Sequence, residues 1–214
     1  MEIHYFYIKS LFIFKNKCVK MVASEVLFMK LKKELPEELL FLEEEPSFDD
    51  KITTVCFTGH RNVPENEVEA ISALLEAQIY ELYDRGARIF KTGGAVGFDT
   101  MAAKAVLSMK DRFGEDGIHL YLCLAAPDQA MRFSKSQKAD FDYIFSMSDG
   151  VTYASESLTK DSYFARNRAL VQGSDVCLAY CKKQYGGSYY TCRQALSSGV
   201  ELVNLADFLC MFED

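Results

Sequence analysis

The sequence lacks the features that would assign it at once to several common classes. Its 214 residues include no tryptophan, four prolines and three histidines. The seven cysteines form no Cys-X-X-Cys pair, and no small-residue cleavage site follows the apolar run at residues 1–20. These absences argue against a disulfide-rich secreted protein and against a zinc site. We therefore expect a cytoplasmic protein with reduced thiols and no bound metal ion.

An excess of positive charge is also missing. The formal net charge is -7 at pH 7, and the isoelectric point is near 5.1. Proteins that bind DNA or RNA usually carry a basic surface, and single-stranded DNA binding calls for a basic groove with stacking aromatic side chains. The apolar N-terminal run is interrupted by Lys9 and is too short for a membrane span. The composition thus predicts neither a nucleic-acid partner nor a membrane.

Residues 1–50 differ in composition from the rest of the chain. They pass from an apolar, aromatic segment to the mixed-charge stretch LKKELPEELLFLEEEPSFDD, which ends as an acidic linker. We interpret them as an N-terminal extension that is poorly ordered or partly helical, with translation from Met21 or Met29 as an alternative. Residues 51–214 are long and apolar enough to form one folded domain.

Strand-like and helix-like segments alternate from residue 52 onward. Strands are expected over residues 52–59, 87–92, 118–126, 150–155, 174–181 and 200–207. Helices are expected over residues 64–85, 99–114, 129–147, 160–173 and 189–199. Asn62 is the expected N-cap of the first helix. This order predicts an α/β protein with a Rossmann-like parallel sheet and helices on both faces.

The ends of the first two strands carry residues suited to a ligand, because parallel sheets bind ligands beyond the carboxyl ends of their strands. After the first strand come Thr58, Gly59, His60 and Arg61. After the second comes KTGGAVGFDT, which has Thr92 where a dinucleotide fingerprint needs glycine and lacks the Gly-Lys-Ser/Thr of a Walker A loop. It keeps Gly93, Gly94, Gly97 and Asp99 at a helix start, where free amides favour an anion. Asp99 is equally well explained as a first-turn carboxylate or as a ligand for ribose hydroxyls.

A second glycine pair follows the fifth strand. The segment YGGSYYT contains Gly186, Gly187, Ser188 and Thr191 at another expected helix start. Arg166 and Asn167 lie on the preceding helix, and Pro127 follows the third strand. Because the two glycine-rich helix starts open on the same edge of the sheet, we predict that they form the two halves of one phosphate-binding crevice.

Five segments together resemble a known family. CFTGHR, TGGAVGFDT, LAAPDQAMRF, ARNRALV and YGGSYYT, in this order and spacing, resemble the YspA/YpsA-like family of the SLOG superfamily, which is related to the DNA-processing protein DprA and to the LOG enzymes. The resemblance covers residues from about 52 to 206. It implies a Rossmann-like fold and the binding of a nucleotide or a nucleotide derivative.

Carried over by position, the resemblance implies one ligand pocket. Its residues would be Thr58, Gly59, His60, Arg61, Gly93, Gly94, Gly97, Asp99, Pro127, Arg166, Asn167, Gly186, Gly187, Ser188 and Thr191. Two positions depart from the family pattern, since Phe133 stands where relatives often have tryptophan and Gln172 where they often have aspartate. The second change removes a polar contact and leaves the identity of the ligand open.

The residues favour a ligand-binding sensor or regulatory module over an enzyme, because no nucleophile and base form an evident pair. ADP-ribose, NAD or a nucleoside monophosphate is the expected type of ligand, and no cofactor is required. The alternative is a LOG-like phosphoribohydrolase that cleaves the N-glycosidic bond of a nucleoside monophosphate. The glutamate of the LOG signature is replaced by Arg193 and Gln194, so Asp99 would be the only carboxylate able to act. A homodimer remains open, and no protein partner is indicated.

Overall fold

The computed structural model describes residues 52–114 and 117–212. The expected N-terminal extension, residues 1–50, lies outside the described residues, so its character and its boundary stay predictions. None of the helices among the described residues is long and apolar enough to cross a membrane.

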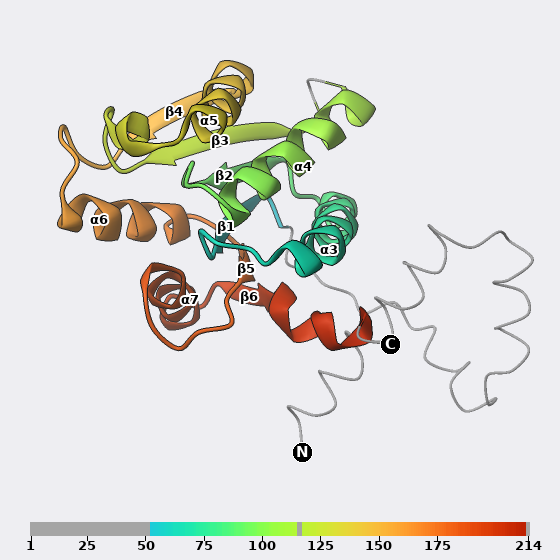
Figure 1. The fold of residues 1–214 in the computed structure, drawn as a ribbon. Helices are drawn as coiled ribbons and strands as arrows, with labels where there is room; N and C mark the ends of the chain where they lie inside the picture. The colour runs from blue at the N-terminus through green and yellow to red at the C-terminus, as the bar shows by residue number, and fades with distance from the viewer. Residues whose placement is uncertain (1–51, 115–116, 213–214) are drawn as a thin grey trace, which may run out of the picture. The chain divides into compact units, whose positions relative to one another are not determined.

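The described chain forms a six-stranded sheet in the order β4-β3-β2-β1-β5-β6 (Figure 1). All neighbouring strands pair in parallel. The strands are β1 (Thr54–Gly59), β2 (Ile89–Thr92), β3 (His119–Leu124), β4 (Gly150–Tyr153), β5 (Val176–Tyr180) and β6 (Glu201–Asn204). The predicted fold class, a Rossmann-like parallel sheet, is confirmed.

Helices cover both faces of the sheet. They are α3 (Glu65–Asp84), α4 (Phe98–Phe113), α5 (Lys135–Met147), α6 (Lys160–Val171) and α7 (Gly187–Ser197), with the 3-10 helices η2 (Gln129–Arg132) and η3 (Leu205–Phe212). The strands from β1 to β4 step in one direction, and right-handed crossovers therefore place α3, α4 and α5 on one face. The chain then crosses back to β5, so α6 and α7 pack together on the other face (Figure 1).

The central strands are buried because helices cover them on both sides. All five residues of β5 are buried, and so are the first five of β1. Such continuous apolar runs are typical of parallel strands. The edge strand β4 is only partly covered, and its last two residues are exposed.

Two helix starts differ from the sequence-based expectation. The helix expected from Gln129 begins instead at Lys135, because Ser134 forms a capping box with Gln137, and residues 129–132 form the 3-10 helix η2. The N-cap of α3 is Pro64 rather than Asn62, and no side chain caps it. A capping box thus sets the start of α5, whereas the start of α3 has no side-chain cap.

The order in which the chain adds strands to the sheet reverses at β1. This strand pairs with β2 on one side and with β5 on the other, although the chain reaches β5 only after β2, β3 and β4. In an open parallel sheet this switch point is where the loops on the two sides diverge and leave room for a ligand. The glycine-rich starts of α4 and α7 follow β2 and β5, the two neighbours of β1.

Candidate functional site

A cavity of about 340 Å³ lies at this switch point. Its lining residues come from the end of β1 and the loop after it, from the start of α4, from α6, and from the loop that leads into α7. They are Thr58, Gly59, His60, Arg61, Ala95, Asp99, Tyr163, Arg166, Asn167, Leu170, Lys183, Tyr185, Gly186, Gly187 and Ser188. The volume falls within the range of sites for small ligands and cofactors.

The start of α7 is open towards the cavity. Gly186, the N-cap residue, has φ +90°, and no side chain caps the helix. Within the described part of the chain, the backbone amides of Gly187, Ser188 and Tyr189 have no hydrogen-bond acceptor. Free amides at a helix start, together with the positive end of the helix dipole, attract an anion.

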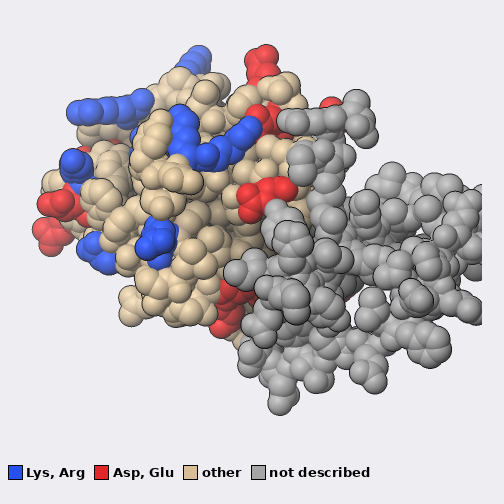
Figure 2. Space-filling view, turned by 90° about the horizontal axis from the view of Figure 1, so that it is seen from below, with Lys and Arg blue, Asp and Glu red and all other residues tan. Residues whose placement is uncertain are grey.

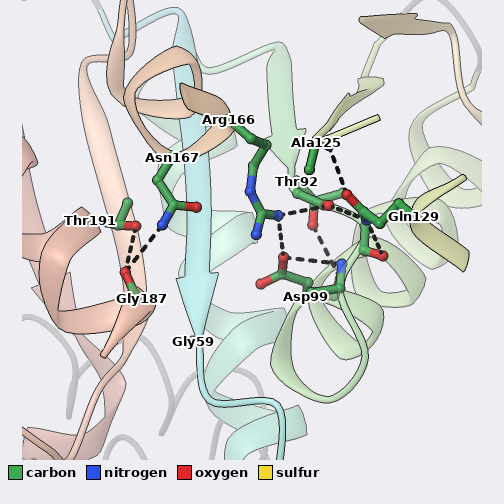
Figure 3. Close-up of polar contacts among 12 residues, drawn as sticks. Gly59, Thr92, Asp99, Ala125, Gln129, Arg166, Asn167, Gly187 and Thr191 are labelled. Atoms are coloured by element: carbon green, nitrogen blue, oxygen red, sulfur yellow. Dashed lines mark hydrogen bonds and ion pairs between the residues drawn. The ribbon is translucent and has the colours of Figure 1, made fainter. Parts of the chain in front are cut away.

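Side chains from α6 and α7 hold this helix start in place. The Ser188 hydroxyl donates to the carbonyl oxygen of Gly59 at the end of β1, with 2.6 Å between the oxygens. The carbonyl oxygen of Gly187 accepts from Asn167 Nδ2 at 3.3 Å and from Thr191 Oγ1 at 3.0 Å (Figure 3). These bonds fix the carbonyl groups, so that the amides keep their direction before a ligand arrives.

The start of α4 is already occupied by the protein itself. The amide of Phe98 donates to the carbonyl oxygen of His60 at 3.1 Å, and Gly97 packs against the backbone that follows β1. Asp99 Oδ2 accepts from the amide of Ala95 at 3.3 Å. The two glycine-rich helix starts do open on one cavity, but they are not equivalent: an acidic side chain stands at α4, whereas α7 presents free donors.

A buried ion pair connects α4 to α6. Arg166 Nη1 lies 3.5 Å from Asp99 Oδ2 and donates to the carbonyl oxygen of Gly93 at 2.7 Å (Figure 3). The two side chains are only 8% and 6% exposed, so the pair is largely removed from water. A second side chain from the loop after β3, Gln129, donates to the carbonyl oxygens of Gly93 and Gly94 and accepts from the amide of Ala125.

The ion pair leaves hydrogen-bonding capacity on both partners. Arg166 uses only Nη1, while Nη2 and Nε have no acceptor among the described residues, and Nε is buried. Asp99 uses only Oδ2, which leaves Oδ1 without a donor in the same part of the chain. Because both residues line the cavity, Arg166 Nη2 and Asp99 Oδ1 remain for a ligand.

Burial changes the acid–base behaviour of three cavity residues. It raises the pKa of Asp99 above its ordinary value, although the nearby Arg166 opposes the shift. It also lowers the pKa of Arg166, against the pull of Asp99. Burial and then the charges of Lys183 and Lys182 lower the pKa of His60. His60 Nε2 accepts from the amide of Lys182 at 2.8 Å, so the ring is the neutral Nδ1–H tautomer.

Ten of the fifteen residues predicted to bind a ligand line this cavity, and five do not. Gly93 lies beneath Arg166, Gly94 adopts φ +61° beside Leu124, and Gly97 packs on the backbone of Arg61. Thr191 is fully buried and supports Gly187, while Pro127 is exposed outside the cavity. Ligand binding by all fifteen stays a prediction.

Sequence reasoning missed five lining residues: Ala95, Tyr163, Leu170, Lys183 and Tyr185. Tyr163 and Leu170 had a usable signal, because they lie three residues before and four after Arg166, on the same face of α6. Across the cavity, the Arg61 guanidinium lies 5.2 Å from the centre of the Tyr163 ring, a cation–π contact. Lys183 lies 5.8 Å from the ring centre of Tyr185 in the loop before α7.

The described residues offer no ready metal site. In residues 52–114 and 117–212, histidine, cysteine and acidic side chains do not gather in groups of three that would hold a metal ion. The side chains and backbone that line the cavity offer guanidinium, ammonium, amide and hydroxyl donors, and Asp99 is the one carboxylate acceptor beside them. This set suits an anionic organic ligand better than a cation.

The fold and the site define a Rossmann-like α/β protein with a cavity at the switch point of its parallel sheet. The model of the YspA SLOG family matches residues 55–203, and the chain belongs to that family. The resemblance noted in the sequence is therefore confirmed. No curated protein matched the chain.

Two solved structures share the fold. DNA processing protein A from Helicobacter pylori, which has a unique single-stranded DNA binding mode, superposes with a TM-score of 0.52 at 18% identity, covering 83% of this chain and 84% of that one. DNA processing protein A from Streptococcus pneumoniae superposes with a TM-score of 0.52 at 19% identity. The match covers 84% of this chain and 70% of the Streptococcus pneumoniae chain. At these identities the likeness concerns the fold.

The net charge led to the expectation that this chain has no nucleic-acid partner, and that expectation is wrong. The Helicobacter pylori protein shows that this fold can accommodate single-stranded DNA. The total of -7 averages over the whole chain, including its acidic linker, whereas binding depends on the local surface. Lys and Arg side chains are spread over the face seen in Figure 2, and Arg61, Arg166 and Lys183 line the cavity.

Proposed function

We propose that the cavity binds a nucleotide or a nucleotide derivative, such as ADP-ribose, NAD or a nucleoside monophosphate, and that the protein acts as a sensor or regulatory module. The proposal rests on one observation: two sets of hydrogen-bond donors line the same cavity. The free amides of Gly187, Ser188 and Tyr189 stand at the start of α7, and the free edge of Arg166 lies on α6. Such donors match the oxygens of a phosphate group.

The charges around the cavity support one orientation of the ligand. Lys183 lies in the loop that leads into α7, where it would add to the attraction for phosphate, and Arg61 brings a further positive charge to the cavity. Asp99 stands at the opposite start, that of α4, where an ionised carboxylate repels phosphate and accepts hydrogen bonds from hydroxyls. We therefore assign the phosphate to α7 and the ribose hydroxyls to Asp99.

Replacing Arg61 with glutamine is expected to weaken binding of a phosphorylated ligand about tenfold or more, because one charge-assisted hydrogen bond contributes about 1.5 to 3 kcal/mol. The matched control is Arg168→Gln on α6, whose guanidinium is exposed and bonds Tyr190 Oη at 3.3 Å rather than lining the cavity. Isothermal titration with ADP-ribose, NAD, AMP and a short single-stranded oligonucleotide measures both variants beside the parent protein.

Three results would refute the proposal. The first is a folded parent protein that binds none of the mononucleotide-type ligands. The second is an equal loss of affinity in Arg61→Gln and Arg168→Gln. The third is binding of the oligonucleotide alone, because that outcome assigns the donors to a nucleic-acid backbone.

A second candidate, hydrolysis of the N-glycosidic bond of a nucleoside monophosphate, is favoured by Asp99. It is buried, it has a raised pKa, and it is the acidic side chain that lines the cavity. In this reaction Asp99 would take a proton from a water molecule that attacks the ribose carbon bound to the base. The products would be the free base and ribose 5-phosphate.

Under the hydrolase alternative, Asp99→Asn should lower the rate of purine release from AMP by a factor of about 100 or more, because general acid–base catalysis contributes about that much. The affinity for AMP should change far less, since asparagine keeps the shape and one acceptor oxygen. Release is followed by chromatography and affinity by titration. If the parent protein binds AMP and releases no purine, the binding function stands and the hydrolase alternative is abandoned.

A further inference from the structure

Two cysteines line a second cavity, which shares Lys183 with the ligand cavity. This second cavity, of about 450 Å³, lies between the segment after β5, helix α7 and the segment after β6. Cys181 directly follows β5, and Cys192 lies on the second turn of α7. Both line the cavity, which gives a small reagent access to them.

The contacts of Cys181 place its sulfur in a defined position. Asn204 holds its peptide from both sides, since Oδ1 accepts from the Cys181 amide at 2.9 Å and Nδ2 donates to its carbonyl oxygen at 3.1 Å. The thiol of Cys181 is hydrogen-bonded with that of Cys192 and also donates to the carbonyl oxygen of Lys183 at 3.3 Å. Cys181 is half-buried, and Cys192 is 6% exposed.

We propose that Cys181 and Cys192 form a reactive dithiol that is oxidised to an intramolecular disulfide by a low-molecular-weight, anionic disulfide. Both thiols line the same cavity and interact with each other, which brings the sulfurs within reach for a disulfide. Lys182, Lys183 and Arg193 line the same cavity with one acidic residue, Asp207, and this excess of positive charge favours an anionic reagent.

The reaction proceeds by two thiol–disulfide exchanges. Cys181, the more accessible sulfur, loses its proton to solvent and attacks one sulfur of the reagent, which forms a mixed disulfide and releases the first reagent thiolate. Cys192 then loses its proton and attacks Cys181 Sγ, which closes the protein disulfide and releases the second thiolate. Two protein thiols are oxidised, one reagent disulfide is reduced to two thiols, and the two protons pass to the thiolates.

The acid–base behaviour of the two thiols agrees with this order of attack. The hydrogen bond from Cys192 lowers the pKa of Cys181 to about 7, so a large share of it is thiolate at neutral pH. The pKa of Cys192 is raised by the same contact and by burial, which suits the thiol that reacts second.

Oxidation would also change the wall of the ligand cavity. A disulfide removes the thiol proton that Cys181 donates to Lys183, and Lys183 lines the ligand cavity. The neighbouring residue, Lys182, donates its amide to His60, another lining residue. The dithiol is thus linked to the ligand cavity through the loop between β5 and α7, although its reactivity does not depend on the proposed function.

The test is incubation of the full chain with glutathione disulfide, followed by peptide mapping with mass spectrometry. The parent protein should yield a Cys181–Cys192 cross-link, which dithiothreitol reverses. Cys192→Ser should accumulate a mixed disulfide at Cys181, because the second thiol is absent. Cys181→Ser should leave Cys192 at least tenfold less modified than Cys181 is in the other variant.

Cys177→Ser serves as the control, because Cys177 lies on β5 close to this pair but is fully buried. It should form the Cys181–Cys192 cross-link at the rate of the parent protein. The proposal is overturned if the oxidised parent protein lacks this cross-link. It is equally overturned if Cys192→Ser carries no adduct on Cys181, or if Cys181→Ser and Cys192→Ser react to the same extent.

Discussion

Replacing Arg166 with methionine is expected to lower the free energy of unfolding by about 3 to 5 kcal/mol and to abolish ligand binding. The substitution leaves the Asp99 carboxylate buried without its counter-charge, and it removes the hydrogen bond to the Gly93 carbonyl oxygen at 2.7 Å. Chemical denaturation gives the stability, and titration with the ligand identified for the parent protein gives the affinity. The control is Arg168→Met, because Arg168 lies two residues further along α6 and is exposed. This substitution should change the free energy of unfolding by less than about 1 kcal/mol.

The loss in Arg166→Met should depend on pH in a defined direction. Burial already raises the pKa of Asp99, and removing the positive charge raises it further. A carboxyl group whose pKa is higher in the folded than in the unfolded protein stabilises the fold at low pH and loses that contribution as the pH rises through its folded pKa. The deficit should therefore be larger at pH 8 than at pH 5.

A double variant separates stability from binding. Adding Asp99→Asn to Arg166→Met removes the unpaired charge and should restore part of the stability, while binding stays lost because the guanidinium is still absent. Equal stability of Arg166→Met and the parent protein would contradict the assignment of a buried, interdependent ion pair.

Gly97→Ala is expected to cost about 3 kcal/mol or more of folding free energy. Gly97 has φ +82°, a conformation that side chains rarely adopt, and a Cβ atom there would lie 2.3 Å from the carbonyl oxygen of Arg61 and 2.7 Å from that of His60. Both neighbours are backbone atoms, so the overlap is relieved only by moving the segment after β1 away from α4. Thermal and chemical denaturation measure the loss.

The opposite end of the same helix supplies a matched control. Gly114, the C-cap residue of α4, also has φ +82°, but a Cβ atom there would meet nothing within 4 Å in the described part of the chain. Gly114→Ala thus carries the conformational cost without the overlap and should lose only about 1 to 2 kcal/mol. Similar losses in the two variants would show that the close approach at Gly97 contributes little.

The fold could be predicted almost completely from the sequence, because its signals are repeated along the chain. The runs at 52–59 and 174–181 have continuously apolar centres, residues 55–57 and 176–180, as is typical of strands covered on both faces, and both became central strands. The start of α5 had a signal in the sequence, because Ser134 and Gln137 have the spacing of a capping box, but the polar helix-like stretch that begins near Gln129 obscures it. Hydrogen bonds of single side chains decide such boundaries.

The glycine pattern located the site but did not reveal what each glycine does. Gly59 leaves room for the ring of Phe98, since a Cβ atom would lie 2.4 Å from it, and Gly93 leaves room for Arg166, whose Nη1 would lie at 1.5 Å. At Gly186 and Gly187, by contrast, the space in front of the helix start is open. A sequence shows that a side chain is absent, but it does not show whether a neighbouring side chain or a ligand fills the space.

The position of β1 has a mechanical consequence. Residues up to β4 build one half of the sheet and residues from β5 build the other, and the chain passes between the halves once, through α6. The cavity is shared by the two halves, with Asp99 on one side and Gly187 on the other, and Arg166 on the connecting helix. A molecule held by all three residues would act as a removable bridge between the loops of the two halves, in addition to the strand pairing of β1 with β5 that already joins them.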